Sequence, residues 1–185
     1  MMIMVKQTAG RDQLGDFAPK FAELDDDVLF GEVWSREANK KDIDRNLLKL
    51  YIEAFNMHYE KRRDIFAKKK EETLKEELVN MLNNEEEKVF VIENDKEIIG
   101  YISIKINNKT TKSIWIDELM IDKDYQNKGY GKSLINKVYQ YAEENNCKRI
   151  ELSCWSFNEN AKNFYHKQGF KEQRVIYERN INSNN

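Results

Sequence analysis

Proline, glycine and cysteine are all scarce in this sequence. Its 185 residues include one proline and seven glycines, where average usage would give about nine and about thirteen. This composition excludes a collagen-like protein and a Pro/Gly linker array, and it disfavours a sandwich of many short strands. The two cysteines, Cys147 and Cys154, have no metal-ligand spacing and suggest no disulfide framework. We expect them to pack as small apolar residues, with a reactive thiol as the alternative.

Long apolar runs and an excess of one charge are also missing. No apolar run approaches the ~20 residues of a membrane-spanning helix, and the N-terminus lacks the apolar segment of a signal peptide. The 31 Lys and Arg residues nearly balance 33 Asp and Glu residues, for a formal net charge of −2. The two signs interleave, so no basic face for nucleic acid is indicated. We therefore expect a cytoplasmic protein with neither a membrane nor a nucleic acid as partner.

Apolar spacing predicts two helices followed by a meander of strands. From residue 39 to residue 84, apolar residues recur every three to four positions, which is the helical period. Asn39 or Asp42 supplies the first N-cap. The pattern then alternates at period two, which predicts three antiparallel strands. These strands are expected over residues 89–92, 98–106 and 114–121.

The rest of the chain predicts further alternation of helices and strands. A helix is expected over residues 132–144 and a strand over 149–155. A short helix over 158–167, ended by Gly169, precedes a final strand over 170–180.

Gly129 and Gly131 lie between a predicted strand and a predicted helix. A helix N-terminus offers unpaired N–H groups and the positive end of its dipole, and glycines let a ligand approach the backbone closely. Together these features favour a site for phosphate oxygens, and a plain tight turn is the alternative. A Walker A loop would need a glycine at position 126 and a dinucleotide fingerprint one at position 134. The chain has Gln126 and Leu134 there, so neither motif matches.

Two separate segments resemble one family, the GNAT N-acetyltransferases. Residues 126–131, Gln-Asn-Lys-Gly-Tyr-Gly, resemble that family's phosphate loop, Gln/Arg-x-x-Gly-x-Gly/Ala. Residues 158–170, Asn-Glu-Asn-Ala-Lys-Asn-Phe-Tyr-His-Lys-Gln-Gly-Phe, resemble its Asn-x-x-Ala-x-x-Phe-Tyr-x-Lys-x-Gly-Phe segment. The resemblance covers about residues 36–181. It implies an α/β (α+β) fold with a mixed, mostly antiparallel sheet that splays between strands 4 and 5 and is flanked by helices.

The resemblance also implies acetyl-CoA as cosubstrate, with no metal. Its pantetheine arm would lie along the strand residues, like an added strand. A backbone N–H near Met120 would polarise the thioester carbonyl. Asn158 would lie beside the pantetheine, and the loop would bind the pyrophosphate. The residues implied for binding are Leu119, Met120, Ile121, Gln126, Asn127, Lys128, Gly129, Tyr130, Gly131, Lys132 and Asn158.

Glu118 and Tyr165 are the catalytic candidates that the resemblance implies. Glu118, next to the expected thioester, would take a proton from the amine, or it is an ordinary strand residue. Tyr165 would protonate the leaving thiolate, or it is a core aromatic. Asp117 and Glu151 are weaker candidates for the base. Some relatives carry an acid on the fifth strand where this chain has Ser153, so the identity of the base stays open.

The implied function is acetyl transfer from acetyl-CoA to a primary amine by direct attack. The alternative is a non-catalytic module that binds CoA or a protein on the same fold. The acceptor is an open choice among an aminoglycoside, a polyamine, an amino acid and a protein N-terminus. His58 would border the acceptor site or is structural, and a homodimer is a further open alternative.

Residues Ala9 to Glu37 resemble the first helices of carboxymuconolactone decarboxylase-family proteins. That family's Cys-x-x-Cys and His machinery has no counterpart in the sequence, so the resemblance carries no activity. We expect an N-terminal extension over residues 1–35, as a possible fused fragment, and the acetyltransferase domain over 36–181. A disordered tail is expected over 182–185. Alternatively, residues 31–36 form the domain's first strand.

Overall fold

A computed structural model describes residues 33–94, 97–108 and 111–181 of the chain. In these ranges, five strands form one sheet in the order β1-β2-β3-β4-β5. Successive neighbours are antiparallel except β4 and β5, which are parallel. The architecture is therefore the predicted mixed, mostly antiparallel sheet with flanking helices. Most of the segment that resembles carboxymuconolactone decarboxylases and the expected tail over 182–185 lie outside the described residues.

The elements follow the predicted order of helices, meander, helix, strand and helix. In chain order they are β1 (Val33–Glu37), the 3-10 turn η1 (Lys40–Asp42), the π-helical turn η2 (Ile43–Leu47), α3 (Leu48–Lys61), α4 (Glu71–Asn83), β2 (Glu87–Asn94), β3 (Glu97–Asn107), β4 (Ser113–Ile121), the 3-10 turn η3 (Lys123–Tyr125), α5 (Tyr130–Glu144), β5 (Arg149–Glu151) and α6 (Glu159–Lys167). The first strand, β1, begins before the domain boundary expected at residues 35 and 36.

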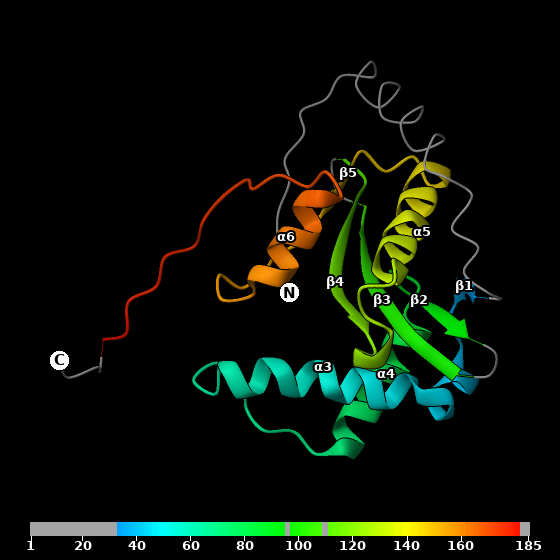
Figure 1. Cartoon of the computed structure of the whole chain (residues 1–185), viewed down its shortest axis with the longest axis horizontal. Coiled ribbons are helices and arrows are strands. Elements are labelled where there is room, and N and C mark those ends of the chain that lie inside the picture. The colour runs from blue at the N-terminus through cyan, green and yellow to red at the C-terminus, as the bar shows by residue number, and fades with distance from the viewer. Residues whose placement is uncertain (1–32, 95–96, 109–110, 182–185) are drawn as a thin grey trace.

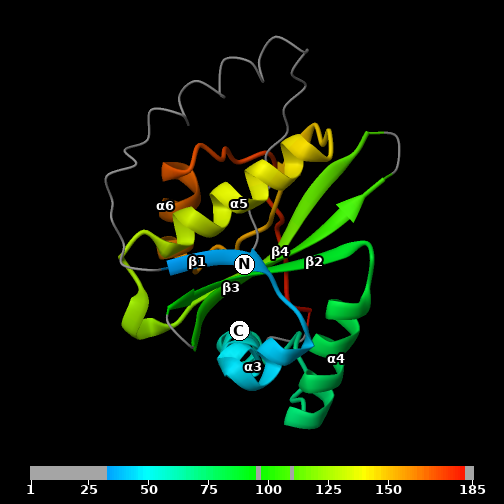
Figure 2. The same ribbon diagram turned by 90° about the vertical axis from the view of Figure 1, so that its right-hand side faces the viewer.

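Helices cover both faces of the sheet (Figure 1). Figure 2 shows α5 and α6 on one side of the strands and α3 and α4 on the other. The period of two along β2 explains how each face has its own core. Phe90 and Ile92 pack in the cluster that includes α5 and α6, whereas Val89 and Val91 pack in the cluster that includes η2, α3 and α4. A strand that is buried on both faces has a continuous run of apolar residues in its sequence.

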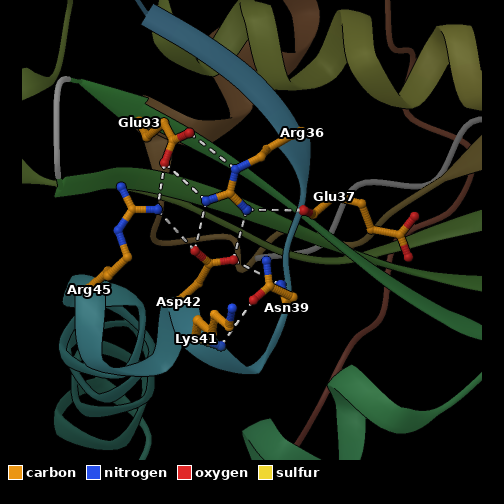
Figure 3. Close-up of polar contacts among 7 residues, drawn as sticks. All are labelled: Arg36, Glu37, Asn39, Lys41, Asp42, Arg45 and Glu93. Carbon is orange, nitrogen blue, oxygen red and sulfur yellow. Dashed lines mark hydrogen bonds and ion pairs between the residues drawn. The ribbon is translucent and has the colours of Figure 1, made fainter.

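An ion-pair network holds β1 against the first helical turn and β2 (Figure 3). Arg36 binds Asp42 through both Nη atoms, at 2.8 and 2.7 Å, and its Nη2 lies 2.9 Å from Oε2 of Glu93. Arg45 Nη1 lies 2.9 Å from the same Glu93 oxygen. Although burial favours the neutral acid, hydrogen bonds from Arg36 and from the N–H of Asn39 hold the pKa of Asp42 below its usual value. Asn39 is the N-cap, and with Asp42 it forms a capping box, so both predicted capping residues are used.

The final strand predicted over residues 170–180 is wrong for the described residues. The structure assigns neither helix nor strand to residues 171–180, and Figure 1 shows them leaving the body of the molecule after α6. A strand needs a neighbouring strand to satisfy its N–H and C=O groups, and none of the five described strands pairs with this segment. The strand expected over 149–155 is also shorter, because β5 keeps its ladder with β4 only to Glu151.

Candidate functional site

The strands β4 and β5 pair over three residues and then separate. Ser113, Ile114 and Trp115 are opposite Arg149, Ile150 and Glu151. Residues 116–121 of β4 stay alongside β3, and no described strand pairs with their other edge. The predicted splay between strands 4 and 5 is thus present. It leaves peptide N–H and C=O groups along one edge of β4, where an extended amide chain can pair.

A β-bulge lies where the two strands separate. On β3, the neighbours Ser103 and Ile104 are opposite Glu118 and Ile116, so Asp117 is the extra residue. Its carboxylate accepts a hydrogen bond from Lys105 at 2.6 Å on the exposed side. Bulges bend a strand and re-aim its side chains, and they are common beside functional sites. Here the register places Glu118 opposite Ser103, on the same face of the sheet as Tyr101.

Glu118 is partly buried at this point and is bonded to a core tyrosine. The hydroxyl of Tyr101 donates a hydrogen bond to Oε2 of Glu118. Tyr101 is fully buried and lies 6.4 Å, between ring centroids, from Tyr51 of α3. Burial raises the pKa of Glu118 to about 7, the Tyr101 hydrogen bond opposes this shift, and the charge of Asp117 adds to it. A carboxylate with this pKa can accept a proton near neutral pH.

Tyr165 of α6 is fully buried in the core cluster on the α5 side of the sheet. Its ring meets Phe164 and Phe170 edge-on at centroid distances of 5.1 and 5.6 Å. Within the part of the chain that the structure describes, its hydroxyl has no hydrogen-bond partner. Burial, and then the charges of Cys154 and Glu118, raise its pKa well above the usual value. The phenol therefore keeps its proton at neutral pH, and its hydroxyl can donate a hydrogen bond to a group placed beside it.

The loop before α5 has the backbone shape that an anion needs. Gly129, the N-cap of α5, has φ +86° and provides no side-chain cap, and Asn127 has φ +60°. The first N–H groups of a helix have no acceptor within it, and here the preceding residues 126–129 are exposed. The side chain of Gln126 donates to the carbonyl of Ile121 at 3.0 Å, which ties the loop to the end of β4. Lys128 Nζ bonds the carbonyl of Asp124 at 2.9 Å.

The helix α5 begins at Tyr130, two residues earlier than the sequence predicts. Gly131 is therefore in the first turn of the helix and not in the loop. A Cβ on Gly131 would lie 3.2 Å from Cζ of Phe164, so this glycine lets α6 pack closely against α5. Gly100 is also a close-packing position, because a Cβ there would lie 2.8 Å from the carbonyl oxygen of Met120.

The other predicted binding residues lie on β4, at the N-terminus of α6 and in the first turn of α5. Leu119 and Ile121 pack against the α5 side, and Met120 packs against the α3 side. Asn158 is the N-cap of α6, where its Oδ1 accepts from the N–H of Ala161 at 3.2 Å. Its side chain thus has a structural role, and its contact with a cosubstrate stays a prediction. The remaining two predicted binding residues lie in the first turn of α5, where Tyr130 is buried and Lys132 is partly buried.

Sequence reasoning missed an aromatic cluster between α3 and the segment after β5. Phe66 lies between His58 and Trp155, at centroid distances of 6.1 and 6.2 Å. Trp155 stacks on Phe157 at 5.8 Å, and the Arg62 guanidinium lies 4.7 Å from the Trp155 ring centroid. Burial lowers the pKa of His58 to about 4, so this side chain stays neutral. No motif marks the cluster, because its members come from three separate segments.

Both cysteines follow the expectation of packing. Cys147 is buried and Cys154 is partly buried, and burial raises the pKa of Cys154 to about 11, which disfavours a reactive thiolate. Within the described ranges, no group of three or more His, Cys, Asp or Glu residues is arranged to hold a metal ion. None of the helices in those ranges has the length and apolar character needed to cross a membrane.

Comparison with known proteins finds a family whose model matches this chain. The family model described as the acetyltransferase (GNAT) family matches residues 47–170. An uncharacterised N-acetyltransferase of Methanocaldococcus jannaschii is 28% identical over 145 residues, which cover 76% of this chain and 62% of that protein. The chain thus spans less than two thirds of the length of this curated relative.

Two solved structures share the fold. A mutant of the BH1408 protein from Bacillus halodurans has a TM-score of 0.72 and 24% identity, and the match covers 80% of this chain and 99% of that one. The second structure is AAC(6')-Iy in complex with the bisubstrate analogue CoA-S-monomethyl-acetylneamine. It has a TM-score of 0.64 and 16% identity, with 81% and 99% covered. Since the family model matches more than half of its residues, the chain belongs to the acetyltransferase (GNAT) family.

Proposed function

We propose that this protein transfers the acetyl group of acetyl-CoA to a primary amine. One observation carries the proposal. The carboxyl of Glu118, with its pKa raised to about 7, lies where β4 separates from β5. The charge of Glu118 also contributes to the raised pKa of the buried Tyr165, so the two groups interact. We infer that Glu118 acts as the proton acceptor and Tyr165 as the proton donor of the reaction.

The residues present fit acetyl-CoA, which supplies an activated acetyl thioester when bound. The exposed loop and the first turn of α5 offer backbone N–H groups, from Asn127 to Lys132, for the pyrophosphate. The edge of β4 at residues 119–121 offers peptide groups for the amides of the pantetheine arm. The buried hydroxyl of Tyr165, without a partner in the described part, is available for the sulfur. Asn158 is a further proposed contact.

The chain's own residues handle the protons of the reaction. An amine is mostly protonated at neutral pH and must lose a proton before its lone pair can attack. The carboxylate of Glu118 accepts that proton, and the free lone pair then forms the new C–N bond. The second proton, which the nitrogen loses on becoming an amide, balances the one that Tyr165 gives up. The N–H of a residue near Met120 stabilises the negative charge that develops on the thioester oxygen. Tyr165 gives its proton to the sulfur as the C–S bond breaks, so a thiol and not a thiolate leaves.

We propose a small-molecule amine as the acceptor. Glu118 lies on the face of the sheet that α3 covers, and the aromatic cluster around Phe66 adjoins the same helix. A carboxylate beside aromatic faces suits a cationic amine. The related structure of AAC(6')-Iy holds an analogue that joins CoA to acetylneamine, which supports an aminoglycoside-like amine as the first class to test.

The test is thiol release from acetyl-CoA with a panel of amines, together with calorimetry of acetyl-CoA binding. The panel contains an aminoglycoside, a polyamine, amino acids and a peptide with a free N-terminus. We expect binding, and release with at least one amine far above hydrolysis in its absence. Binding without transfer to any amine would instead support the non-catalytic module. Absence of binding would contradict the assignment of the loop.

A further inference from the structure

Ser103 of β3 has a buried hydroxyl without a hydrogen-bond partner among the described residues. The residue is 2% exposed, so bulk water does not solvate it. A hydroxyl can donate one hydrogen bond and accept two, and burial without any of them destabilises a fold. Folded proteins pair the large majority of such groups, and an exception calls for an explanation. The position of Ser103 in the sheet supplies one.

The register of β3 and β4 places Ser103 directly opposite Glu118. Residues in such an antiparallel pair point to the same face of the sheet, with Cβ atoms about 4.5–5.5 Å apart. The pair adjoins the bulge at Asp117, where the register shifts. Tyr101 lies two residues before Ser103 and therefore shares its face. The hydroxyl of Ser103 is thus a close neighbour of the Glu118 carboxyl, on the side of the sheet that α3 covers.

The carboxyl of Glu118 has room for a second hydroxyl. Tyr101 donates to Oε2, and this bond uses one of the roughly four acceptor positions of a carboxylate. After Glu118 takes up a proton, its carboxyl becomes a donor as well as an acceptor. One hydroxyl cannot give a proton to one carboxyl oxygen and accept a proton from the other at the same time. A second hydroxyl on the same face, such as that of Ser103, resolves this conflict.

The ionisable groups around Glu118 do not supply that second hydroxyl. Asp117 repels the charge of Glu118 and is paired with Lys105 on the exposed side. Burial raises the pKa of Tyr51 and of Tyr165 well above the usual value, so both phenols stay neutral near pH 7. The ionisable side chains that act on Glu118, or on the residues beside it, are Tyr101 and Lys105 of β3, Asp117 of β4, Tyr51 of α3, Glu77 of α4, Glu87 of β2 and Tyr165 of α6.

We propose that Ser103 is a positioning residue whose hydroxyl is the second hydrogen-bond partner of the Glu118 carboxyl in both of its protonation states. The inference rests on the proposed function, in which Glu118 accepts the proton of the amine. While Glu118 is ionised, the hydroxyl of Ser103 donates to the carboxylate. After the proton arrives, the hydroxyl turns and its oxygen accepts from the carboxyl O–H, so Ser103 keeps its own proton throughout. Tyr101 and Ser103 together hold the carboxyl in one orientation toward the opening between β4 and β5.

The two bonds of Ser103 differ in strength, and this difference gives the proposal a measurable sign. A hydrogen bond to an ionised group is roughly twice as strong as one between neutral groups. Ser103 therefore favours the ionised form of Glu118 and opposes the effect of burial, as Tyr101 does. Removal of the hydroxyl is expected to raise the pKa of Glu118.

Carbon-13 NMR of the protein labelled at its glutamate carboxyl carbons measures this pKa without any need for activity. The signal of Glu118 is the one that disappears in Glu118→Gln. In Ser103→Ala, we expect its titration midpoint to move up by about one pH unit. Ser103→Thr keeps the hydroxyl and is expected to keep the midpoint of wild type. The matched control is Ser113→Ala, because Ser113 is also 2% exposed but lies in the part of β4 that pairs with β5. An unchanged midpoint in Ser103→Ala, or an equal change in Ser113→Ala, would overturn the proposal.

The pH profile of acetyl transfer tests the same residue in the reaction. The acidic limb of kcat/KM reports the pKa of the base in the free enzyme, so it should move up by the same amount in Ser103→Ala, with an unchanged KM for acetyl-CoA. An unmoved limb in an active protein would contradict the role of Ser103. A moved NMR midpoint in a protein that transfers acetyl to no amine would support the contact of Ser103 with Glu118 and contradict the proposed function. The two hypotheses can therefore fail separately.

Discussion

The two parts of β4 differ in their neighbours and in what they can do. Residues Ser113–Trp115 lie between β3 and β5, and Ser113 and Ile114 are buried. After the bulge at Asp117, the strand keeps β3 on one side and has no described strand on the other. Glu118 in this second part is partly buried and has a raised pKa. One strand thus has a closed part that stabilises the sheet and an open part that is available for chemistry.

The largest effect is expected from Glu118→Gln in the open part. Glutamine keeps the shape of the side chain and can still accept the hydrogen bond from Tyr101, but it cannot take up a proton as carboxylate does. We expect kcat/KM to fall by about 10²–10⁴-fold, the typical worth of a general base. The measurement is thiol release with the best amine of the panel.

Asp117→Asn is the control for this variant. It removes the neighbouring carboxylate, which pairs with Lys105 on the surface. An exposed ion pair contributes about 0–1 kcal/mol, so the rate should stay within about fivefold of wild type. Equal losses in the two variants would show that general negative charge, and not the base at Glu118, supports the rate.

In the closed part, Ile114→Ala is expected to weaken folding instead of chemistry. Ile114 is fully buried, and such a truncation costs about 2–5 kcal/mol. Urea unfolding measures the loss, and kcat per folded molecule should stay near wild type. Leu119→Ala in the open part is the comparison, with a smaller loss of stability and a higher KM for acetyl-CoA. A larger loss of stability in Leu119→Ala than in Ile114→Ala, with a higher KM only in Ile114→Ala, would contradict the distinction between the two parts of β4.

Tyr165→Phe removes one hydroxyl from the other side of the opening. If Tyr165 protonates the leaving sulfur, kcat falls by about 10²-fold, while calorimetry gives nearly the same affinity for acetyl-CoA. Tyr139→Phe is the control, since its hydroxyl contacts the carbonyl of Gln168 at 3.4 Å, away from the opening. An unchanged kcat in Tyr165→Phe would remove this residue from the mechanism.

Gly129→Ala tests the loop that follows the open part of β4. Left-handed backbone costs a non-glycine residue about 1–2 kcal/mol, so we expect a distorted loop and about tenfold weaker acetyl-CoA binding. Gly169→Ala has a matching φ of +85° and open space around a Cβ. It should lose similar stability while binding acetyl-CoA normally. Equal binding by the two variants would contradict the role of the loop.

The pH dependence of stability tests the raised pKa of Glu118 itself. The pKa of Glu118 is about 7 in the folded state against an ordinary 4.5, so the folded protein holds the proton more tightly than the unfolded chain. Wild type therefore loses stability as the pH rises from about 4.5 to about 7. Glu118→Gln does not ionise, so its Tm should exceed that of wild type at about pH 8 and match it at about pH 4. A difference of the same size at both pH values would contradict the raised pKa.

Local pattern predicted the meander and the helices before and after it, since period and capping are properties of neighbouring residues. The Gly-rich turn between strand and helix indicated the loop at Gly129, whereas Glu118 and Tyr165 were candidates only through the resemblance to a family. The hydrogen bond from Tyr101 to Glu118 depends on the β3–β4 register. The bulge at Asp117 shifts that register, and alternating apolar residues do not reveal where a bulge falls. The pairing could therefore not be predicted from the sequence.

The lack of a strand over residues 171–180 could not be predicted for a related reason. Val175 and Tyr177 have the spacing of a strand, and that spacing indicates which residues share a side but not which strand lies beside them. The sequence placed Gly131 in the loop because the residue that explains this glycine lies far away in the sequence. Its missing Cβ makes room for Phe164 of α6, and only the packing of two helices shows this.

Amide hydrogen exchange of the nitrogen-15-labelled protein, with and without acetyl-CoA, tests the difference between the two parts of β4 most directly. The account predicts that acetyl-CoA slows exchange at residues 119–121 and 127–132, where the pantetheine and the pyrophosphate bind. Exchange at residues 113–115, already paired on both sides, should not change. Uniform slowing along the whole of β4, or protection confined to other elements, would contradict the proposed site.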